Sequence, residues 1–176
     1  MRRFLKWVAL VSAALFICVQ FVRPVRTNPP VELERTIEAH VRITPEVARV
    51  FERACKDCHS NRTEWPWYTN VTPVSWYVVD HVEHGRKNMN FSEWSTYDPE
   101  QADWLLGAIC MTATRGSMPL KSYTRLHHTA KLSLADVQTL CAWSQAESER
   151  INQRKGKGKR GKGKGERIKT RTALRA

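Results

Sequence analysis

The sequence has almost no negative charge near either end. The first acidic residue is Glu32, and a single acid, Glu166, follows residue 150. Basic residues gather in the same two regions, so residues 1–26 carry a net charge of +5 and residues 151–176 carry +10. Residues 27–150 carry −3, and the whole chain of 176 residues carries +12. Because the middle of the chain is mildly acidic, its charge argues against a basic globular domain that binds nucleic acid.

Several other patterns are missing. No stretch alternates apolar and polar residues as a half-buried strand does. No glycine-rich phosphate loop, hydrolytic triad or pair of catalytic carboxylates stands out. The sequence therefore predicts an all-α protein with one small helical domain, and it assigns no residue a catalytic role. An enzyme is therefore not favoured.

A long run without charge lies near the N-terminus. Residues 7–22 carry no charge, with three basic residues before them and two after them. As a helix, Phe4 to Val22 would reach about 28 Å, close to the thickness of a bilayer core. No small-residue cleavage site follows, which favours an uncleaved anchor over a removed signal peptide. We therefore assign residues 1–26 to one transmembrane helix in a bacterial inner membrane, with the remaining chain in the periplasm.

Helix starts divide the middle of the chain. Each combines a polar or hydroxyl residue with proline or an acid, and apolar residues at helical spacing follow. The starts are Thr44-Pro45, Thr72-Pro73, Asp98-Pro99 and Ser133-Leu134. Residues 115–132 are predicted to be irregular, and a short helix is expected within 32–41. These patterns predict a linker over 27–44 and one helical domain over 45–150.

The C-terminal region is a repeat of lysine and glycine. Glycine and mutually repelling charges bury no apolar surface, so residues 151–176 are predicted to be a disordered basic tail. Such a tail would attract anionic lipid or an acidic protein partner, or act only as a solubilising extension. The predicted periplasmic location excludes nucleic acid as its partner.

One motif carries a specific chemistry. Cys55-Lys56-Asp57-Cys58-His59 has the Cys-x-x-Cys-His spacing of c-type haem attachment. The two thiols are placed to add to the two vinyl groups of one porphyrin. His59 then follows at the position of the proximal iron ligand. The motif occurs once, which predicts one haem c per chain, attached at Cys55 and Cys58.

Other uses of Cys-x-x-Cys fit less well. A zinc site needs two further ligands at short spacing, and the next cysteines, Cys110 and Cys141, are distant and far apart. A thioredoxin-like redox pair would need a βαβ setting, which the pattern does not provide. Cys110 and Cys141 themselves could form a disulfide or lie separately in the core, and the sequence slightly favours two separate buried thiols.

Met118 is the favoured second iron ligand. It lies in the segment Gly116-Ser117-Met118-Pro119-Leu120, where a thioether next to proline in a non-helical loop suits Met/His ligation. Methionine also fills gaps in cores, so simple packing is the alternative. Four histidines compete for the position: His81, His84, His127 and His128. An open sixth site is the remaining possibility.

The aromatic residues after the motif are candidates for walls of the haem pocket. They are Trp65, Trp67, Tyr68 and Trp76, and Arg86 is a candidate partner for a propionate. An ordinary aromatic core and a solvated surface charge explain these residues equally well.

Taken together, these blocks resemble the small membrane-anchored bacterial haem-binding-domain proteins, a cytochrome-c-like group. The resemblance spans about residues 30–147. Its blocks are Cys55 to Asn61, Thr63 to Tyr68, Pro73 to Trp76, Gly85-Arg86, Asn90 to Trp94, Gly116 to Leu120, Tyr123 with Leu126-His127, and Ala130 to Ser133. It implies covalent haem, with His59 as proximal ligand and Met118 opposite, but no settled physiological reaction.

Two functions follow as expectations. The first is a one-haem electron carrier, tethered to the membrane, that exchanges electrons with a redox partner protein. The second is a haem-based sensor or a small module that handles peroxide or gas ligands at an open sixth site. A zinc-binding interaction module is a distant third.

Overall fold

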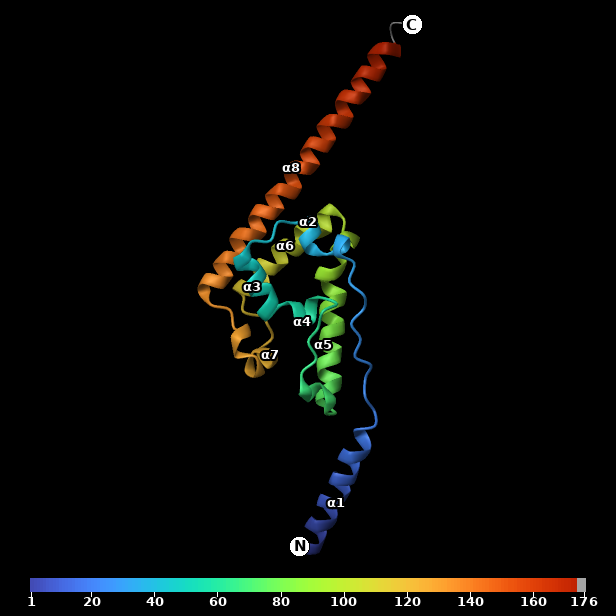
Figure 1. Ribbon diagram of the computed structural model, residues 1–176, viewed down its shortest axis with the longest axis vertical. Coiled ribbons are helices and arrows are strands. Elements are labelled where there is room, and N and C mark those ends of the chain that lie inside the picture. The colour runs from blue at the N-terminus through green and yellow to red at the C-terminus, as the bar shows by residue number, and fades with distance from the viewer. Residues whose placement is uncertain (174–176) are drawn as a thin grey trace.

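The computed structural model describes the backbone of residues 1–173 and the side chains of residues 1–156. Over this part of the chain it contains eight α-helices, four short 3-10 helices and no strand, which confirms the all-α class (Figure 1). The α-helices are α1 (Arg2–Val19), α2 (Ile37–His40), α3 (Pro45–Ala54), α4 (Lys56–His59), α5 (Val74–Asn88), α6 (Pro99–Thr114), α7 (Lys121–Leu126) and α8 (Leu134–Ala173). The 3-10 helices are η1 (Leu33–Arg35), η2 (Trp67–Asn70), η3 (Phe91–Thr96) and η4 (His128–Ala130).

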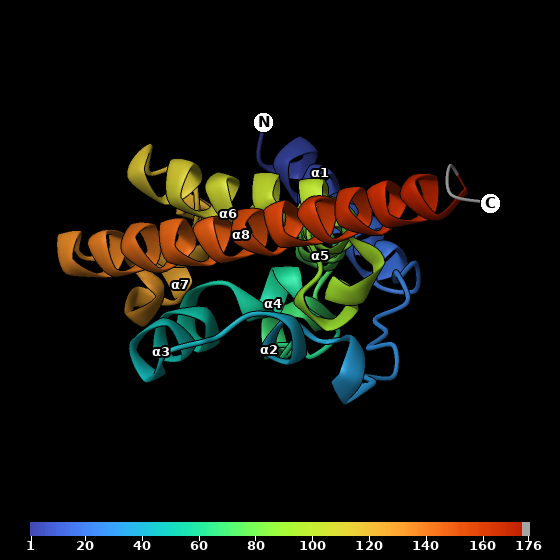
Figure 2. The same ribbon diagram turned by 90° about the horizontal axis from the view of Figure 1, so that it is seen from above.

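Helices α6 and α8 lie side by side, and α3 packs against the start of α8 (Figures 1 and 2). Val47, Val50 and Phe51 lie on one face of α3 and are buried. The Phe51 ring stacks on Phe91 at 4.7 Å and meets the edge of Trp143 at 5.2 Å. The buried core therefore joins α3, η3 and α8, and it lies next to the segment that follows α3.

The helix starts predicted at Thr44 and Asp98 are confirmed at their caps, whereas α5 begins at Val74 without a side-chain cap. The Thr44 hydroxyl accepts a hydrogen bond from the backbone N–H of Val47. Asp98 accepts from the backbone of Glu100 and Gln101, while the Gln101 side chain accepts from the backbone of Asp98, forming a capping box. Residues 115–132 differ from the expected irregular segment, because α7 and η4 form within them.

Cys110 and Cys141 form a disulfide between α6 and α8. The preference for two separate thiols was therefore wrong. The packing of the two helices brings the Cα atoms within 4.6 Å, a separation that the sequence does not reveal. The bond closes a loop with a sequence separation of 31, which is worth about 3–4 kcal/mol through the restricted unfolded chain.

The N-terminal helix differs from the expected transmembrane span. Of the residues that the structure describes, none form a helix both long and apolar enough to cross a membrane. Helix α1 has 18 residues and includes Arg2, Arg3 and Lys6. Its uncharged part, Trp7 to Val19, reaches about 20 Å, against about 30 Å for a hydrocarbon core.

The segment after α1 is fastened to the helical body. The Gln20 side-chain amide donates to the backbone oxygen of Thr72 and accepts from its N–H, both at 2.9 Å. The Trp76 indole N–H donates to the backbone oxygen of Val22 at 2.8 Å. These bonds join the end of α1 to the turn that begins α5.

The basic tail also differs from expectation. We predicted disorder over 151–176, but α8 continues to Ala173, and residues 174–176 lie outside the described chain. Extending an existing helix avoids the cost of nucleation, and lysine and arginine are good helix formers. The packed first half of α8 therefore serves as the nucleus from which the basic half continues.

Candidate functional site

The Cys-x-x-Cys-His segment lies at the junction of α3 and α4. Cys55 ends α3, and Cys58 and His59 lie in α4. Both thiols are unpaired, in contrast to the disulfide at Cys110 and Cys141. Burial, with a smaller effect of Cys58, raises the pKa of Cys55 to about 12; burial and nearby Asp57 raise the pKa of Cys58 to about 11. Both sulfur atoms are therefore protonated at neutral pH.

The His59 ring is held in one tautomer. Its Nδ1 lies 3.0 Å from the backbone oxygen of Met89. A carbonyl oxygen only accepts, so Nδ1 carries the proton and Nε2 keeps a lone pair. Burial lowers the pKa of His59, which keeps the imidazole neutral. One ring nitrogen is thus fixed by a hydrogen bond and the other has the electron pair that a metal requires.

Gly85 permits the close packing of α4 on α5. A Cβ at this position would lie 2.3 Å from the backbone oxygen of Cys58. Gly85 lies within α5, which continues to Asn88. The glycine therefore serves a close backbone contact beside the attachment segment.

An apolar cavity lies beside Cys58. It has a volume of about 210 Å³ and is lined mainly by α4, α5, α7 and the loop that follows α4. Of the residues proposed from the sequence, Cys58, Tyr68 and the competing ligand His81 line it. Residues that the sequence did not single out as pocket walls are Tyr77, Val78, Leu120, Tyr123 and Leu126. Enclosed small-molecule pockets usually exceed about 300 Å³, so a ring as large as a porphyrin also needs room beyond this cavity.

The other proposed pocket residues lie elsewhere. Trp65 lines a neighbouring cavity, and Trp67 is 78% exposed. The indole of Trp76 is bound to the backbone of Val22. Met118 is 39% exposed and is not among the residues that line the apolar cavity, whereas the competing ligand His81 is.

Arg86 acts as a clamp within the chain. Its guanidinium donates to the backbone oxygens of Ser60 and Thr27 and to the side chains of Asn28 and Thr63, each at 2.8 Å. These bonds tie the end of α4 to the N-terminal segment. Four of its five N–H donors are therefore used by the protein itself, which leaves one for a propionate.

A polar network forms one wall of the apolar cavity. The Tyr123 hydroxyl donates to the Asp57 carboxylate at 2.7 Å, and its ring stacks on His127 at 4.2 Å. The Tyr68 hydroxyl lies 2.7 Å from Nε2 of His127. Burial, and then Asp57, raise the pKa of Tyr123, so the phenol remains a donor over the ordinary pH range. The network joins α7 to Asp57, one of the two residues between the motif cysteines.

Substituting Tyr123→Phe is expected to lower the free energy of unfolding by about 1–2 kcal/mol, because a hydrogen bond to a partly buried carboxylate is lost. Denaturant unfolding monitored by tryptophan fluorescence measures this change. Tyr77→Phe is the matched control, since it removes a hydroxyl that donates only to Ser122. An equal effect of both substitutions would contradict the role assigned to Asp57.

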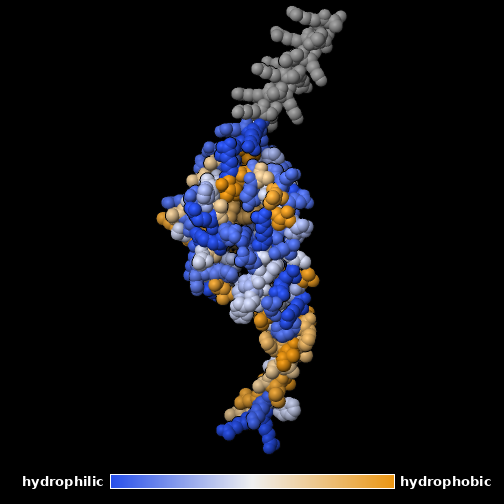
Figure 3. Space-filling view, in the orientation of Figure 1, coloured by the Kyte–Doolittle hydropathy of each residue, from blue (hydrophilic) through white to orange (hydrophobic). Residues whose placement is uncertain are grey.

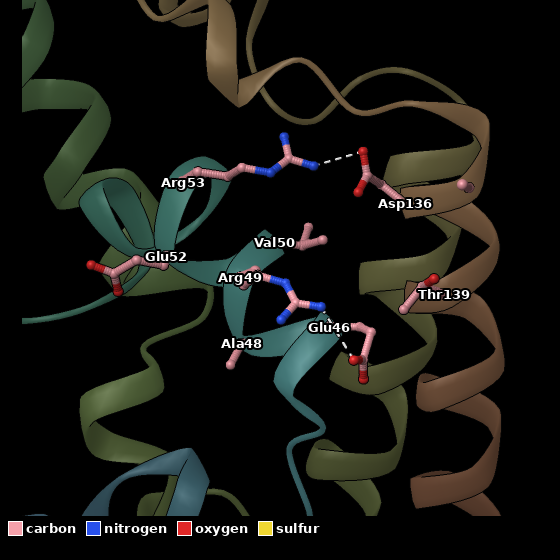
Figure 4. A pocket seen from close by; sticks show the side chains of 9 residues that line it. Glu46, Ala48, Arg49, Val50, Glu52, Arg53, Asp136 and Thr139 are labelled. Carbon is pink, nitrogen blue, oxygen red and sulfur yellow. Dashed lines mark hydrogen bonds and ion pairs between the residues drawn. The ribbon is translucent and has the colours of Figure 1, made fainter.

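A second hollow, between α3 and α8, is charged rather than apolar (Figure 4). Arg49 pairs with Glu46 at 3.2 Å, and Arg53 pairs with Asp136 at 2.6 Å. Burial opposes ionisation of Asp136, but hydrogen bonds from Arg53 and Ser133 lower its pKa to about 2. Each arginine is neutralised by an acid, so this hollow offers no free charge to an anionic ligand.

The donor set distinguishes between metals. Within the described part of the chain, no three histidine, cysteine, aspartate or glutamate side chains lie close enough together to hold a metal ion. This arrangement does not support the zinc module. Two free thiols and one neutral imidazole fit the chemistry of a haem, which brings its own four nitrogen ligands. Of these three residues, only Cys58 lines the apolar cavity.

Comparison with known proteins agrees with this chemistry. A family model described as a haem-binding domain matches residues 14–146. No curated protein and no solved structure matches the chain. Because the family model covers most of the sequence, including the Cys-x-x-Cys-His segment, the chain belongs to the haem-binding domain family.

Proposed function

We propose that this haem-binding domain carries one c-type haem, attached at Cys55 and Cys58, and that it works as an electron carrier. The observation that supports this most strongly is the contrast among the four cysteines of the helical body. Cys110 and Cys141 are bonded to each other, while the two motif cysteines remain thiols next to a neutral, oriented histidine. One pair stabilises the fold and the other is available for attachment.

Attachment is an addition reaction that needs no oxidant. Each S–H would add across one vinyl group, with a carbon–sulfur bond to one vinyl carbon and the proton on the other. His59 would hold the iron through Nε2, because its Nδ1 is bound to the carbonyl of Met89. A bound haem supplies one-electron exchange between ferric and ferrous iron.

The protein's own groups set the conditions for that exchange. The hydrogen bond to His59 fixes the imidazole plane, and the bond from Tyr123 partly neutralises the charge of Asp57 next to the attachment site. The apolar side chains around the cavity exclude water and favour the less charged iron site. In this function Met118 is the second ligand, and a partner protein supplies or accepts the electron.

A second candidate function has one specific observation in its favour. Met118 does not line the cavity beside Cys58, whereas His81 and the hydroxyl-bearing Tyr77 do. A site without methionine ligation would be open to a small gas or to peroxide, as in a sensor or ligand-handling module.

The substitution Met118→Ala distinguishes the two functions. In an electron carrier it removes the thioether ligand, so the reduction potential falls and the ferrous protein gains rapid carbon monoxide binding. Optical spectra, potentiometry and stopped-flow mixing with carbon monoxide measure these changes. The unsubstituted protein should bind carbon monoxide slowly.

Met111→Ala is the matched control, because Met111 is exposed to a similar extent, 41% against 39% for Met118. It should leave the spectrum and the carbon monoxide reaction unchanged. Rapid carbon monoxide binding by the unsubstituted protein would reject the carrier and favour the open site. His81→Ala would then show whether the imidazole on α5 affects that site.

A further inference from the structure

Helix α1 stands away from the helical body and buries none of its side chains against the rest of the described chain (Figures 1 and 3). Its exposed apolar residues include Phe4, Trp7, Leu10, Leu15 and Ile17, each at least 60% exposed. Apolar residues gathered on this scale, with nothing covering them, mark a surface that contacts a partner or a lipid.

The orientation of α1 relative to the body is fixed. The paired hydrogen bonds between Gln20 and Thr72 hold its end, and Trp76 holds the next turn at Val22. Four residues further on, the Arg26 guanidinium donates to the Thr69 hydroxyl at 3.0 Å. These contacts join the chain directly after α1 to the end of the body formed by η2 and the start of α5.

This end of the body also exposes large apolar side chains. Trp67 is 78% exposed, Tyr77 48%, and Val74 and Trp76 40% each. We call α1 together with these four residues the stem surface. Tryptophan and tyrosine combine an apolar ring with a polar atom, and they are enriched where membranes meet water.

Charge identifies the partner of this surface. The first 31 residues contain five basic residues and no acidic one, with three cations at the start of α1 and two after its end. Each cation near an anionic lipid surface contributes about 1 kcal/mol. We propose that the stem surface binds an anionic lipid surface and that the hydrogen bonds of Gln20 hold the helical body there in one orientation, with Trp67 and Trp76 at the headgroup level.

Vesicle binding by the full chain tests the proposal. The probes are vesicles of phosphatidylcholine with phosphatidylglycerol, and of phosphatidylcholine alone, with brominated lipids to quench nearby tryptophans. Binding should be stronger to the anionic vesicles and should decrease with salt. Residues 151–176, with a net charge of +10, would contribute to both effects, so the role of the stem surface is judged from the tryptophan substitutions. Trp67→Gln should weaken binding about 5- to 10-fold, because one exposed indole no longer leaves water.

Trp104→Gln is the matched control. Trp104 is 68% exposed on α6, outside the stem surface, so its substitution should change neither binding nor quenching. Gln20→Ala should leave α1 bound but reduce the quenching of Trp67, because the body is released from its fixed orientation. Retained quenching in this variant would contradict the assigned role of Gln20.

Two other results would overturn the proposal. One is an equal loss of vesicle binding in the Trp67 and Trp104 variants. The other is a dimer in detergent that Trp67→Gln dissociates, since the stem surface would then bind a second copy of the chain. The haem spectrum is recorded for every variant, so a failure of haem attachment is separable from a failure of lipid binding.

Discussion

The double substitution Cys55→Ala and Cys58→Ala is expected to abolish covalently bound haem. Neither remaining side chain can form a thioether, and His59 alone would hold haem only by coordination. Haem should therefore be extracted by acidified organic solvent, and no haem should remain with the polypeptide on a denaturing gel. The pyridine haemochrome spectrum of the single variants should shift, because one vinyl group stays unreacted.

Cys110→Ser with Cys141→Ser is the control for this experiment. It removes the same number of sulfur atoms from the α6–α8 contact but leaves the motif intact. Covalent haem should be retained, while the free energy of unfolding falls by about 3–4 kcal/mol. Full haem retention after the loss of Cys55 and Cys58 would reject thioether attachment, whatever the behaviour of the control.

The second large effect is expected at Gly85. Alanine usually stabilises a helix by about 1 kcal/mol relative to glycine. At Gly85 the added methyl group would meet the backbone oxygen of Cys58 at 2.3 Å, and a backbone atom cannot rotate away. We therefore expect Gly85→Ala to lower the free energy of unfolding by about 3 kcal/mol and to reduce haem incorporation, because α4 and α5 must separate. Chemical denaturation and haem content of the purified protein measure the two effects.

Gly107→Ala provides the opposite case. Gly107 lies within α6, and a Cβ there would meet nothing within 4 Å. This substitution should raise the free energy of unfolding by about 0.5–1 kcal/mol and leave the haem content unchanged. If both glycines responded alike, the close contact between Gly85 and Cys58 would not be the cause.

Local sequence signals predicted the helices well. Caps such as Thr44 and Asp98 act on the backbone two or three residues away, so their effect can be deduced from neighbouring letters. The same holds for the Cys-x-x-Cys-His segment, whose spacing fits a known attachment chemistry. The family match confirms a haem-binding domain over residues 14–146.

Features set by distant contacts were harder to predict. The disulfide depends on how α6 and α8 pack, and the clamp of Arg86 joins residues far apart in the chain. Tyr123 belonged to a block of the family resemblance but was assigned no role, and its importance follows from Asp57, 66 residues earlier. Predicting this contact from sequence would require many related sequences in which the residues at positions 57 and 123 change together.

The fastening of the N-terminal segment has a practical consequence for producing this protein. A shortened chain that begins at residue 27, directly after the predicted N-terminal anchor, would lose Gln20, Val22 and Arg26. The Thr72 backbone, the Trp76 indole and the Thr69 hydroxyl would then lose their partners. The family match begins at residue 14, inside α1, and so includes these contacts. A shortened version intended for crystallisation should therefore begin at about residue 20. It would keep these contacts and omit the exposed apolar residues of α1.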